Sequence, residues 1–171
     1  MTATMQRLLE EYPSSDGQPM AESTDQCDWI VKIKNNLDWV FRDDPNVFIA
    51  CDLLWYPVEG QSRINTAPDA MVVFGRPKGD RGSYRQWVED GIAPQVVFEV
   101  LSPGDRTQDV LEKVAEYLHA GVKLVCLVDS RNSSIHMYRP DEPAQVLNST
   151  DIWSASDILP GLEIPVRQLF E

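Results

Sequence analysis

Hydrophobic positions recur at helical spacing in two segments of the chain. The first helix is predicted over residues 24–41, where Ser23 followed by Gln26 three residues later is typical of a capping box. The second helix is predicted over residues 106–120, with Asp105 as its N-terminal cap. The two apolar stripes consist of Ile30, Ile33, Leu37 and Val40 and of Val110, Leu111, Val114, Tyr117 and Leu118.

Continuous apolar runs between turn residues predict the strands of a sheet. Residues 47–60 and 64–75 are expected to contain two strands joined across Gly60 as a hairpin or a meander. Residues 96–102 and 123–130 are expected to form two more. Because the second helix lies between these two, they are predicted to be parallel, with a right-handed crossover.

The last part of the chain has weaker signals. Residues 135–139, IHMYR, are expected to add an antiparallel strand. Residues 152–171 are predicted to be rich in loops, with one short helix.

Length and composition agree with one globular domain. The chain has 171 residues and is 43% hydrophobic, so we expect a single domain over residues 1–171, with residues 1–21 as a loosely ordered N-terminal tail. No apolar run approaches the roughly 20 residues that span a bilayer, and the N-terminus lacks the apolar core of a secretion signal. We therefore expect a cytoplasmic protein. The three cysteines and two histidines have no metal-ligand spacing, and neither a disulfide nor a zinc site is expected.

The charge argues against binding to nucleic acid through the overall field, because the net charge is −12. Positive charge concentrates only in the glycine-rich stretch GRPKGDRGSYRQW, residues 75–87. This basic loop could bind phosphates and stack a base, or it could be a solvated loop with ordinary surface charge. Its positively charged residues are Arg76, Lys78, Arg81 and Arg85.

Two carboxylates in apolar surroundings are the strongest chemical signal. Glu99 lies within the buried-strand sequence VVFEVL, and Asp69 follows Pro68 at the entrance of the strand AMVVF. A buried carboxylate costs several kcal/mol or more unless it is paired, protonated or bound to a metal. If the two strands are neighbours, Asp69 and Glu99 can converge on Mg²⁺ or Mn²⁺, which favour oxygen ligands. The alternative is an ion pair between Glu99 and a lysine or arginine.

Lys113 is a candidate partner from the second helix. At about 100° per residue, Lys113 lies at the boundary of the apolar stripe. Its side chain can lean toward Glu99 or pair with Asp109 on the surface. Arg106 lies on the same flank of the helix.

The segments APDAMVVF, VVFEVLSPGDRTQDVLEKVAEYLHAGV and LVDS resemble the Uma-two type of endonucleases, a family assigned to the restriction-endonuclease-like PD-(D/E)XK superfamily. The resemblance covers roughly residues 22–168. It implies an α/β (α+β) fold with a restriction-endonuclease-like mixed β-sheet flanked by α-helices. Asp69 matches the aspartate of the superfamily motif and Glu99 its glutamate. Leu101 stands where the motif has lysine, and the family's lysine resembles one relocated to the following helix, here Lys113.

The resemblance implies a metal-dependent mechanism. Asp69, Glu99 and the backbone carbonyl of Val100 would hold Mg²⁺ or Mn²⁺, and Lys113 would act beside them at the phosphodiester. A further acidic ligand is expected from the helix beginning near residue 24 or from Asp52, although solvation at a strand end explains Asp52 equally well. Contacts to DNA would come from the basic loop and from Arg106.

Two functions follow from these residues. The first is a metal-dependent endonuclease acting on DNA, as a homodimer because cutting both strands needs two active sites. The second is a catalytically inactive module with this fold that binds nucleic acid or protein, which the acidic composition and Leu101 favour. A cofactor-dependent enzyme has no motif to support it.

Overall fold

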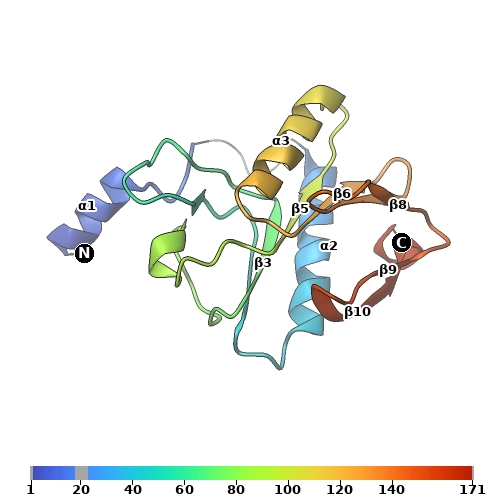
Figure 1. Ribbon diagram of the computed structural model, residues 1–171, viewed down its shortest axis with the longest axis horizontal. Coiled ribbons are helices and arrows are strands. Elements are labelled where there is room, and N and C mark those ends of the chain that lie inside the picture. Colours follow the sequence, from blue (N-terminus) through green and yellow to red (C-terminus); the bar gives the residue numbers. More distant parts are fainter. Residues whose placement is uncertain (1, 18–22, 171) are drawn as a thin grey trace.

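A six-stranded mixed sheet forms the centre of the computed structural model, which describes residues 2–17 and 23–170 (Figure 1). The strand order is β1-β3-β5-β6-β7-β8. β5 and β6 are parallel and the other neighbours are antiparallel. The strands are β1 Val47–Ala50, β3 Ala70–Phe74, β5 Val96–Val100, β6 Leu124–Asp129, β7 Ser134–Tyr138 and β8 Gln145–Leu147. The sheet confirms the predicted parallel pair and the antiparallel strand after it.

Two long helices pack against this sheet. α2, Thr24–Val40, begins at Ser23, whose hydroxyl accepts a hydrogen bond from the Gln26 N–H as predicted. α3, Thr107–His119, begins after Arg106. Asp105 does not cap α3, because its carboxylate accepts a hydrogen bond from the backbone N–H of Ser102 at 2.7 Å and closes the preceding turn.

The alternation of side chains along β5 divides the core in two. Val96, Phe98 and Val100 belong to the hydrophobic cluster that contains the buried face of α2. Val97 belongs to the cluster that contains the buried face of α3. Because successive side chains of a strand point to opposite faces, Glu99 lies on the same face as Val97 and is directed toward α3.

The C-terminal segment completes the cluster on the α2 side. β9, Ile152–Ala155, pairs with β10, Leu159–Pro165, and is followed by α4, Val166–Phe170. Trp153 is fully buried, with its ring 5.3 Å from that of Phe98. The prediction of a loop-rich segment with one short helix was therefore wrong about the hairpin. β9 has only four residues, and the pairing with β10 is interrupted by a bulge between Leu159 and Glu163, so no regular strand pattern marked it in the sequence.

Residues before α2 pack against a small separate cluster. α1, Ala3–Glu11, is a helix, and the Tyr12 that follows it is 6% exposed beside Tyr56 and Trp87. Tyr56 lies in β2, Trp55–Tyr56, which pairs with β4, Tyr84–Arg85, just before the short 3₁₀ helix Gln86–Val88. The prediction of a loosely ordered tail was therefore wrong for residues 3–12, and residues 1 and 18–21 lie outside the described part.

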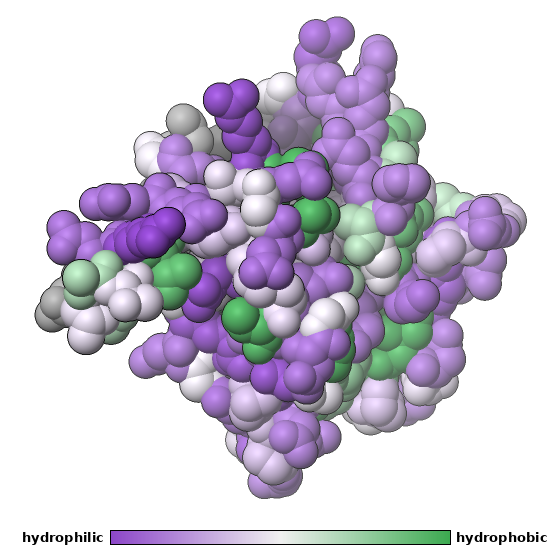
Figure 2. Space-filling view, turned by 60° about the vertical axis from the view of Figure 1, so that its left-hand side comes forward, coloured by the Kyte–Doolittle hydropathy of each residue, from purple (hydrophilic) through white to green (hydrophobic). Residues whose placement is uncertain are grey.

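The surface agrees with the acidic, polar composition. Figure 2 shows a face on which hydrophilic residues dominate and hydrophobic patches are small and separated. Within the described ranges, no helix has the length and apolar character needed to cross a membrane.

Candidate active site

The register of β3 and β5 brings Asp69 and Glu99 together. Ala70 pairs with Phe98 in this antiparallel ladder, so one further step places Asp69 opposite Glu99. The ladder ends there because Pro68 has no N–H to donate. The N–H of Val100 instead donates to Asp69 Oδ2 at 2.8 Å. The Asp69 carboxylate is thus fixed at the end of the strand pair, beside Glu99.

Two side chains from one turn of α3 hold Glu99. Lys113 Nζ lies 3.1 Å from Glu99 Oε1, and the Tyr117 hydroxyl donates a short hydrogen bond to the same oxygen. Lys113 and Tyr117 are four residues apart and therefore project from the same side of the helix. Thr66 Oγ1 lies 3.3 Å from the Tyr117 hydroxyl. The sequence allowed Lys113 to contact either Glu99 or Asp109, and in the structure it contacts Glu99.

The close approach of these groups perturbs their proton affinities. Burial, followed by the negative charge of Glu99, raises the pKa of Asp69 to about 8. Burial alone would lower the pKa of Lys113, but attraction to Glu99 outweighs it and raises that pKa. Burial and Glu99 also raise the pKa of the Tyr117 phenol well above its usual value, so Tyr117 remains a hydrogen-bond donor. The Asp69 carboxyl group therefore retains its proton near neutral pH unless a further cation approaches it.

A cavity of about 460 Å³ opens beside these residues. Its described walls contain only one lysine or arginine side chain, that of Lys113. The carboxylates lining it are Asp16, Asp52, Asp69, Glu99, Asp105 and Asp109. The cavity is therefore strongly negative, and an incoming phosphate would need a cation to enter it.

The expected additional acidic ligand does not join Asp69 and Glu99. Asp52 lines the same cavity but lies just after the end of β1, exposed and in a left-handed conformation with φ 49°, which agrees with the alternative of solvation at a strand end. α2 contributes an amide in place of an acid, because Gln26 Nε2 donates to the Val100 carbonyl at 3.1 Å. Across residues 2–17 and 23–170, no three acidic, histidine or cysteine side chains form a metal-binding group.

The oxygen atoms present nevertheless suit a hard divalent cation. Asp69, Glu99 and Val100 all line the cavity. Mg²⁺ is commonly bound through one or two carboxylates, with water and substrate phosphate completing its coordination. A cation here would also remove the repulsion that raises the pKa of Asp69. The donor set therefore fits such an ion without a third acidic ligand.

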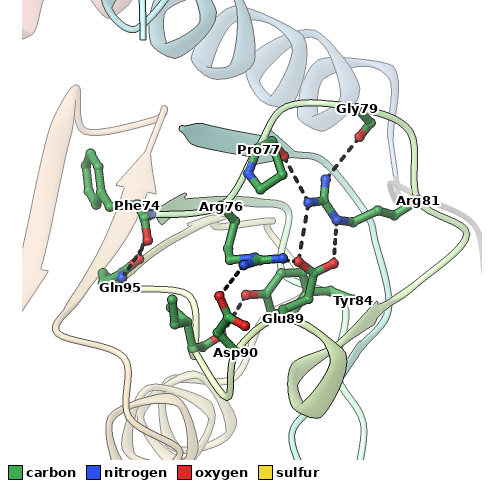
Figure 3. Close-up of polar contacts among 10 residues, drawn as sticks. Phe74, Arg76, Pro77, Gly79, Arg81, Tyr84, Glu89, Asp90 and Gln95 are labelled. Atoms are coloured by element: carbon green, nitrogen blue, oxygen red, sulfur yellow. Dashed lines mark hydrogen bonds and ion pairs between the residues drawn. The ribbon is translucent and has the colours of Figure 1, made fainter. Parts of the chain in front are cut away.

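The basic loop is held by internal ion pairs (Figure 3). Glu89, which is 7% exposed, accepts hydrogen bonds from Arg76 Nε at 2.8 Å and from Arg81 Nε at 2.6 Å. Arg76 also donates to Asp90 at 2.5 Å, and Arg81 donates to two backbone carbonyls of its own loop. We call Arg76, Arg81, Glu89 and Asp90 the loop clasp. Its arginine side chains are engaged with protein carboxylates.

The other residues predicted to contact nucleic acid are dispersed. Lys78 Nζ donates to the backbone carbonyl of Val47 at 2.7 Å. Arg85 is half-buried in a hollow that residues of α1 also line, and Arg106 is exposed at the start of α3. None of the five predicted side chains lines the cavity. The sequence suggested a basic loop over residues 75–87, because Glu89 and Asp90 follow that stretch and their contacts with its arginines could not be seen.

Periodicity did not identify three polar groups at the site. Tyr117 was assigned to the apolar stripe of the second helix, and its hydroxyl contact with Glu99 was missed. Its position four residues after Lys113 was the available signal, because both side chains then face the same strand. Gln26 was recognised only as part of a capping box. Thr66 had no distinguishing pattern, since its contact depends on the path of a long loop.

The mixed sheet, with helices packed on both faces, Asp69 just before β3, and Glu99 of β5 paired with a lysine of α3, has a restriction-endonuclease-like fold. The family model Uma2, described as "Putative restriction endonuclease", matches residues 11–167. The chain belongs to this family.

A solved structure supports the same fold. It is a crystal structure of a "putative nuclease belonging to DUF820" from Anabaena variabilis, with a TM-score of 0.70 and 18% sequence identity. The match covers 92% of this chain and 88% of that one. None of the curated proteins matches this chain.

The carboxylate pair predicts an unusual gain in stability on substitution. Asp69→Asn should raise the melting temperature of the metal-free protein by about 2–8 °C, because it removes the cost, on the order of 1–2 kcal/mol, of keeping an ionisable acid in this buried position, while it keeps an oxygen for the Val100 N–H. Because the folded-state pKa of Asp69 is raised to about 8, wild-type stability should fall as pH rises toward that value. The gain should therefore be small in acid and largest in mild alkali.

Thermal unfolding in a chelator across this pH range measures the effect. Asp141→Asn is the matched control, because Asp141 is exposed and its left-handed conformation, φ 58°, also suits asparagine. Equal melting temperatures for wild type and Asp69→Asn at every pH would contradict the description of the pair.

The loop clasp predicts the opposite pH dependence. Burial alone would raise the pKa of Glu89, but the hydrogen bonds and charges of Arg81 and Arg76 outweigh it and lower that pKa. The clasp should therefore contribute stability above the ordinary glutamate pKa and lose it as pH falls through the lowered value. Glu89→Gln should cost about 2 kcal/mol near neutral pH, roughly 4–8 °C in melting temperature, and less in acid.

Melting curves of Glu89→Gln and of the exposed control Glu142→Gln test this prediction. If the melting temperature of Glu89→Gln stays below that of the wild type by the same amount as the solution is acidified, the carboxylate charge is not what stabilises the loop.

Proposed function

We propose that this protein is a metal-dependent endonuclease that hydrolyses phosphodiester bonds of DNA. The observation that carries the proposal is the contact of Lys113 with Glu99, beside Asp69, in one cavity. Membership of the family supports a nuclease. The particular metal, Mg²⁺ or Mn²⁺, and DNA as the substrate are parts of this proposal.

Asp69, Glu99 and the Val100 carbonyl would hold the cation. When bound, the cation stabilises negative charge on the phosphate and lowers the pKa of water. The Val100 N–H orients Asp69, and Gln26 holds the Val100 carbonyl from the other side. These contacts keep the oxygen donors directed at the cavity.

Lys113 takes the place of the lysine that the superfamily motif has two residues after its glutamate. Leu101 occupies that position and packs at the edge of the α3-side cluster. Lys113 reaches the same face of the sheet from α3 and keeps its positive charge, because its pKa is raised by Glu99. With the cation bound to Glu99, the ammonium group can donate to a phosphate oxygen or orient the attacking water.

Tyr117 acts through Glu99 and is therefore a positioning residue. It is 2% exposed and donates to the oxygen of Glu99 that also faces Lys113. Tyr117 and Lys113 therefore both act on Oε1 of Glu99. Thr66 fixes the hydroxyl of Tyr117 in turn.

A homodimer and a cytoplasmic location stay predictions. An endonuclease that cuts both strands of a duplex needs two active sites, which a dimer would provide. The alternative function is a catalytically inactive module. The observation that supports this alternative is the excess of carboxylates around the cavity.

The direct test is cleavage of plasmid and single-stranded DNA in Mg²⁺ and in Mn²⁺. We expect metal-dependent nicking by the wild type, and a loss of at least about 100-fold in Asp69→Ala, Glu99→Ala and Lys113→Ala. The exposed residues Glu163 and Lys123 provide the controls Glu163→Ala and Lys123→Ala, which should retain activity. Folding of every variant is checked by melting temperature.

The inactive module is the conclusion if no substrate is cut with either metal. Trace cleavage of equal rate in the wild type and the three variants would have the same meaning, because it would come from a contaminant.

Tyr117→Phe separates positioning from packing. The substitution keeps the buried ring but removes the bond to Glu99, so we expect a 10- to 100-fold lower single-turnover rate with little change in DNA affinity. Metal affinity, measured by calorimetry, should fall about 10-fold. Val122→Ala is the packing control, since Val122 is fully buried in the same cluster as Tyr117 but does not line the cavity. An unchanged rate and metal affinity in Tyr117→Phe would contradict its positioning role.

A further inference from the structure

A second hollow, of about 260 Å³, adjoins the candidate active site. It shares four lining residues with the first cavity: Asn65, Thr66, Lys113 and Tyr117. The two spaces thus lie on either side of the side chains that contact Glu99. A group bound in the second hollow would be the neighbour of a group bound at Glu99.

The walls of this hollow differ from those of the acidic cavity. Pro57, Ile64 and Ala120 give it an apolar surface, and His119 and Glu116 stand at its polar edge. Ile64 is 47% exposed and belongs to none of the hydrophobic clusters of the described residues. A large aliphatic side chain that leaves half its surface in water contributes little to the core.

The loop that carries Ile64 is fixed before any ligand arrives. Thr66 and Trp55 exchange two backbone hydrogen bonds, of 2.7 and 3.1 Å. Ile64 donates its N–H to Gln61 at 3.0 Å, and Asn65 Nδ2 donates to the Ser62 carbonyl at 2.8 Å. The hollow is therefore preformed, and binding there would not require ordering of the loop.

We propose that this hollow binds one nucleobase of the nucleic acid whose phosphate lies at Glu99 and Lys113. This inference rests on the proposed nuclease function. The hollow is smaller than the roughly 300–1,000 Å³ of pockets for drug-sized ligands, and it suits a single ring system. A nucleobase has apolar faces, which match Ile64 and Pro57, and polar edges, which match the Asn65 carboxamide oxygen and the His119 ring.

The substrate class follows from this subsite. A base inside a duplex is stacked and paired, so it reaches a lateral pocket only when it is extruded, whereas a base of an unpaired strand enters freely. The protein should therefore prefer single-stranded or locally unpaired DNA next to the scissile bond. The net charge of −12 agrees with this, because affinity for a duplex backbone depends on positive charge.

The first experiment measures binding and does not depend on cleavage. The protein is labelled at isoleucine methyl groups and titrated with thymidine 5′-monophosphate in Ca²⁺, then with deoxyribose 5-phosphate, which lacks the base. The nucleotide should shift the Ile64 methyl resonance, and the sugar phosphate should leave it in place. Ile152, which is 58% exposed in β9, provides an internal control that should not move. Equal responses of Ile64 to both ligands, or no response to either, overturn the subsite.

The second experiment measures cleavage around a missing base. A labelled single-stranded oligonucleotide with one abasic residue is cut in Mn²⁺, and the rate at each linkage is compared with the intact strand. Linkages next to the abasic residue should be cut at least about fivefold more slowly by the wild type and by Ile152→Asp. Ile64→Asp should cut the intact strand as slowly as the wild type cuts next to the abasic residue. Removing the base should then have no further effect on this variant.

The two proposals fail in different ways. Cleavage with the same rate at all linkages, and with equal rates in Ile64→Asp and wild type, removes the subsite but keeps the nuclease. Absence of cleavage on every substrate removes the nuclease, and the methyl titration then still decides whether the hollow takes a base.

Discussion

The pairing of Asp69 with Glu99 at the end of two buried strands is the constraint on which the site depends. Two carboxylates in this position repel each other and lose hydration, and the pKa of Asp69, about 8, expresses that cost. The structure offsets it with the Val100 N–H, the Tyr117 hydroxyl and the Lys113 ammonium group. Two of these three come from α3. The packing of α3 on the sheet, through Val114 and Tyr117, therefore also places the lysine.

Periodicity could predict the central sheet and its two long helices because the core uses strict spacing. β5 and β6 are buried on both faces, which gives uninterrupted apolar runs, and α2 and α3 each bury one stripe. The same logic identified Asp69 and Glu99, since a charge within such a run needs an explanation. Lys113 could be placed at the boundary of its stripe, but only the observed crossover of α3 decided between Glu99 and Asp109.

Contacts between segments far apart in the chain could not be predicted in this way. Tyr12 becomes buried because Tyr56 and Trp87, more than 40 residues later, form the surface it covers. Arg76 and Arg81 carry the same charge in the sequence whether they face solvent or Glu89. Their partner Glu89 is brought back to the loop by the 3₁₀ helix after β4. No hydrophobic periodicity in the sequence predicts this turn. Charge counted along a sequence thus overestimates the charge available to a ligand.

This loss of available charge bears on how the proposed nuclease would recognise DNA. The loop clasp and Lys78 bond to other parts of the protein, and among the described residues that line the cavity Lys113 is the one positive side chain, beside the cation that the carboxylates would hold. Attraction to the phosphate backbone is then short in range and limited to the scissile position. Binding energy beyond that phosphate has to come from contacts that do not depend on charge, and the hollow that shares Lys113 and Tyr117 with the cavity offers an apolar surface for them. An enzyme of this kind gains by holding a single base closely, because it cannot hold a long duplex electrostatically.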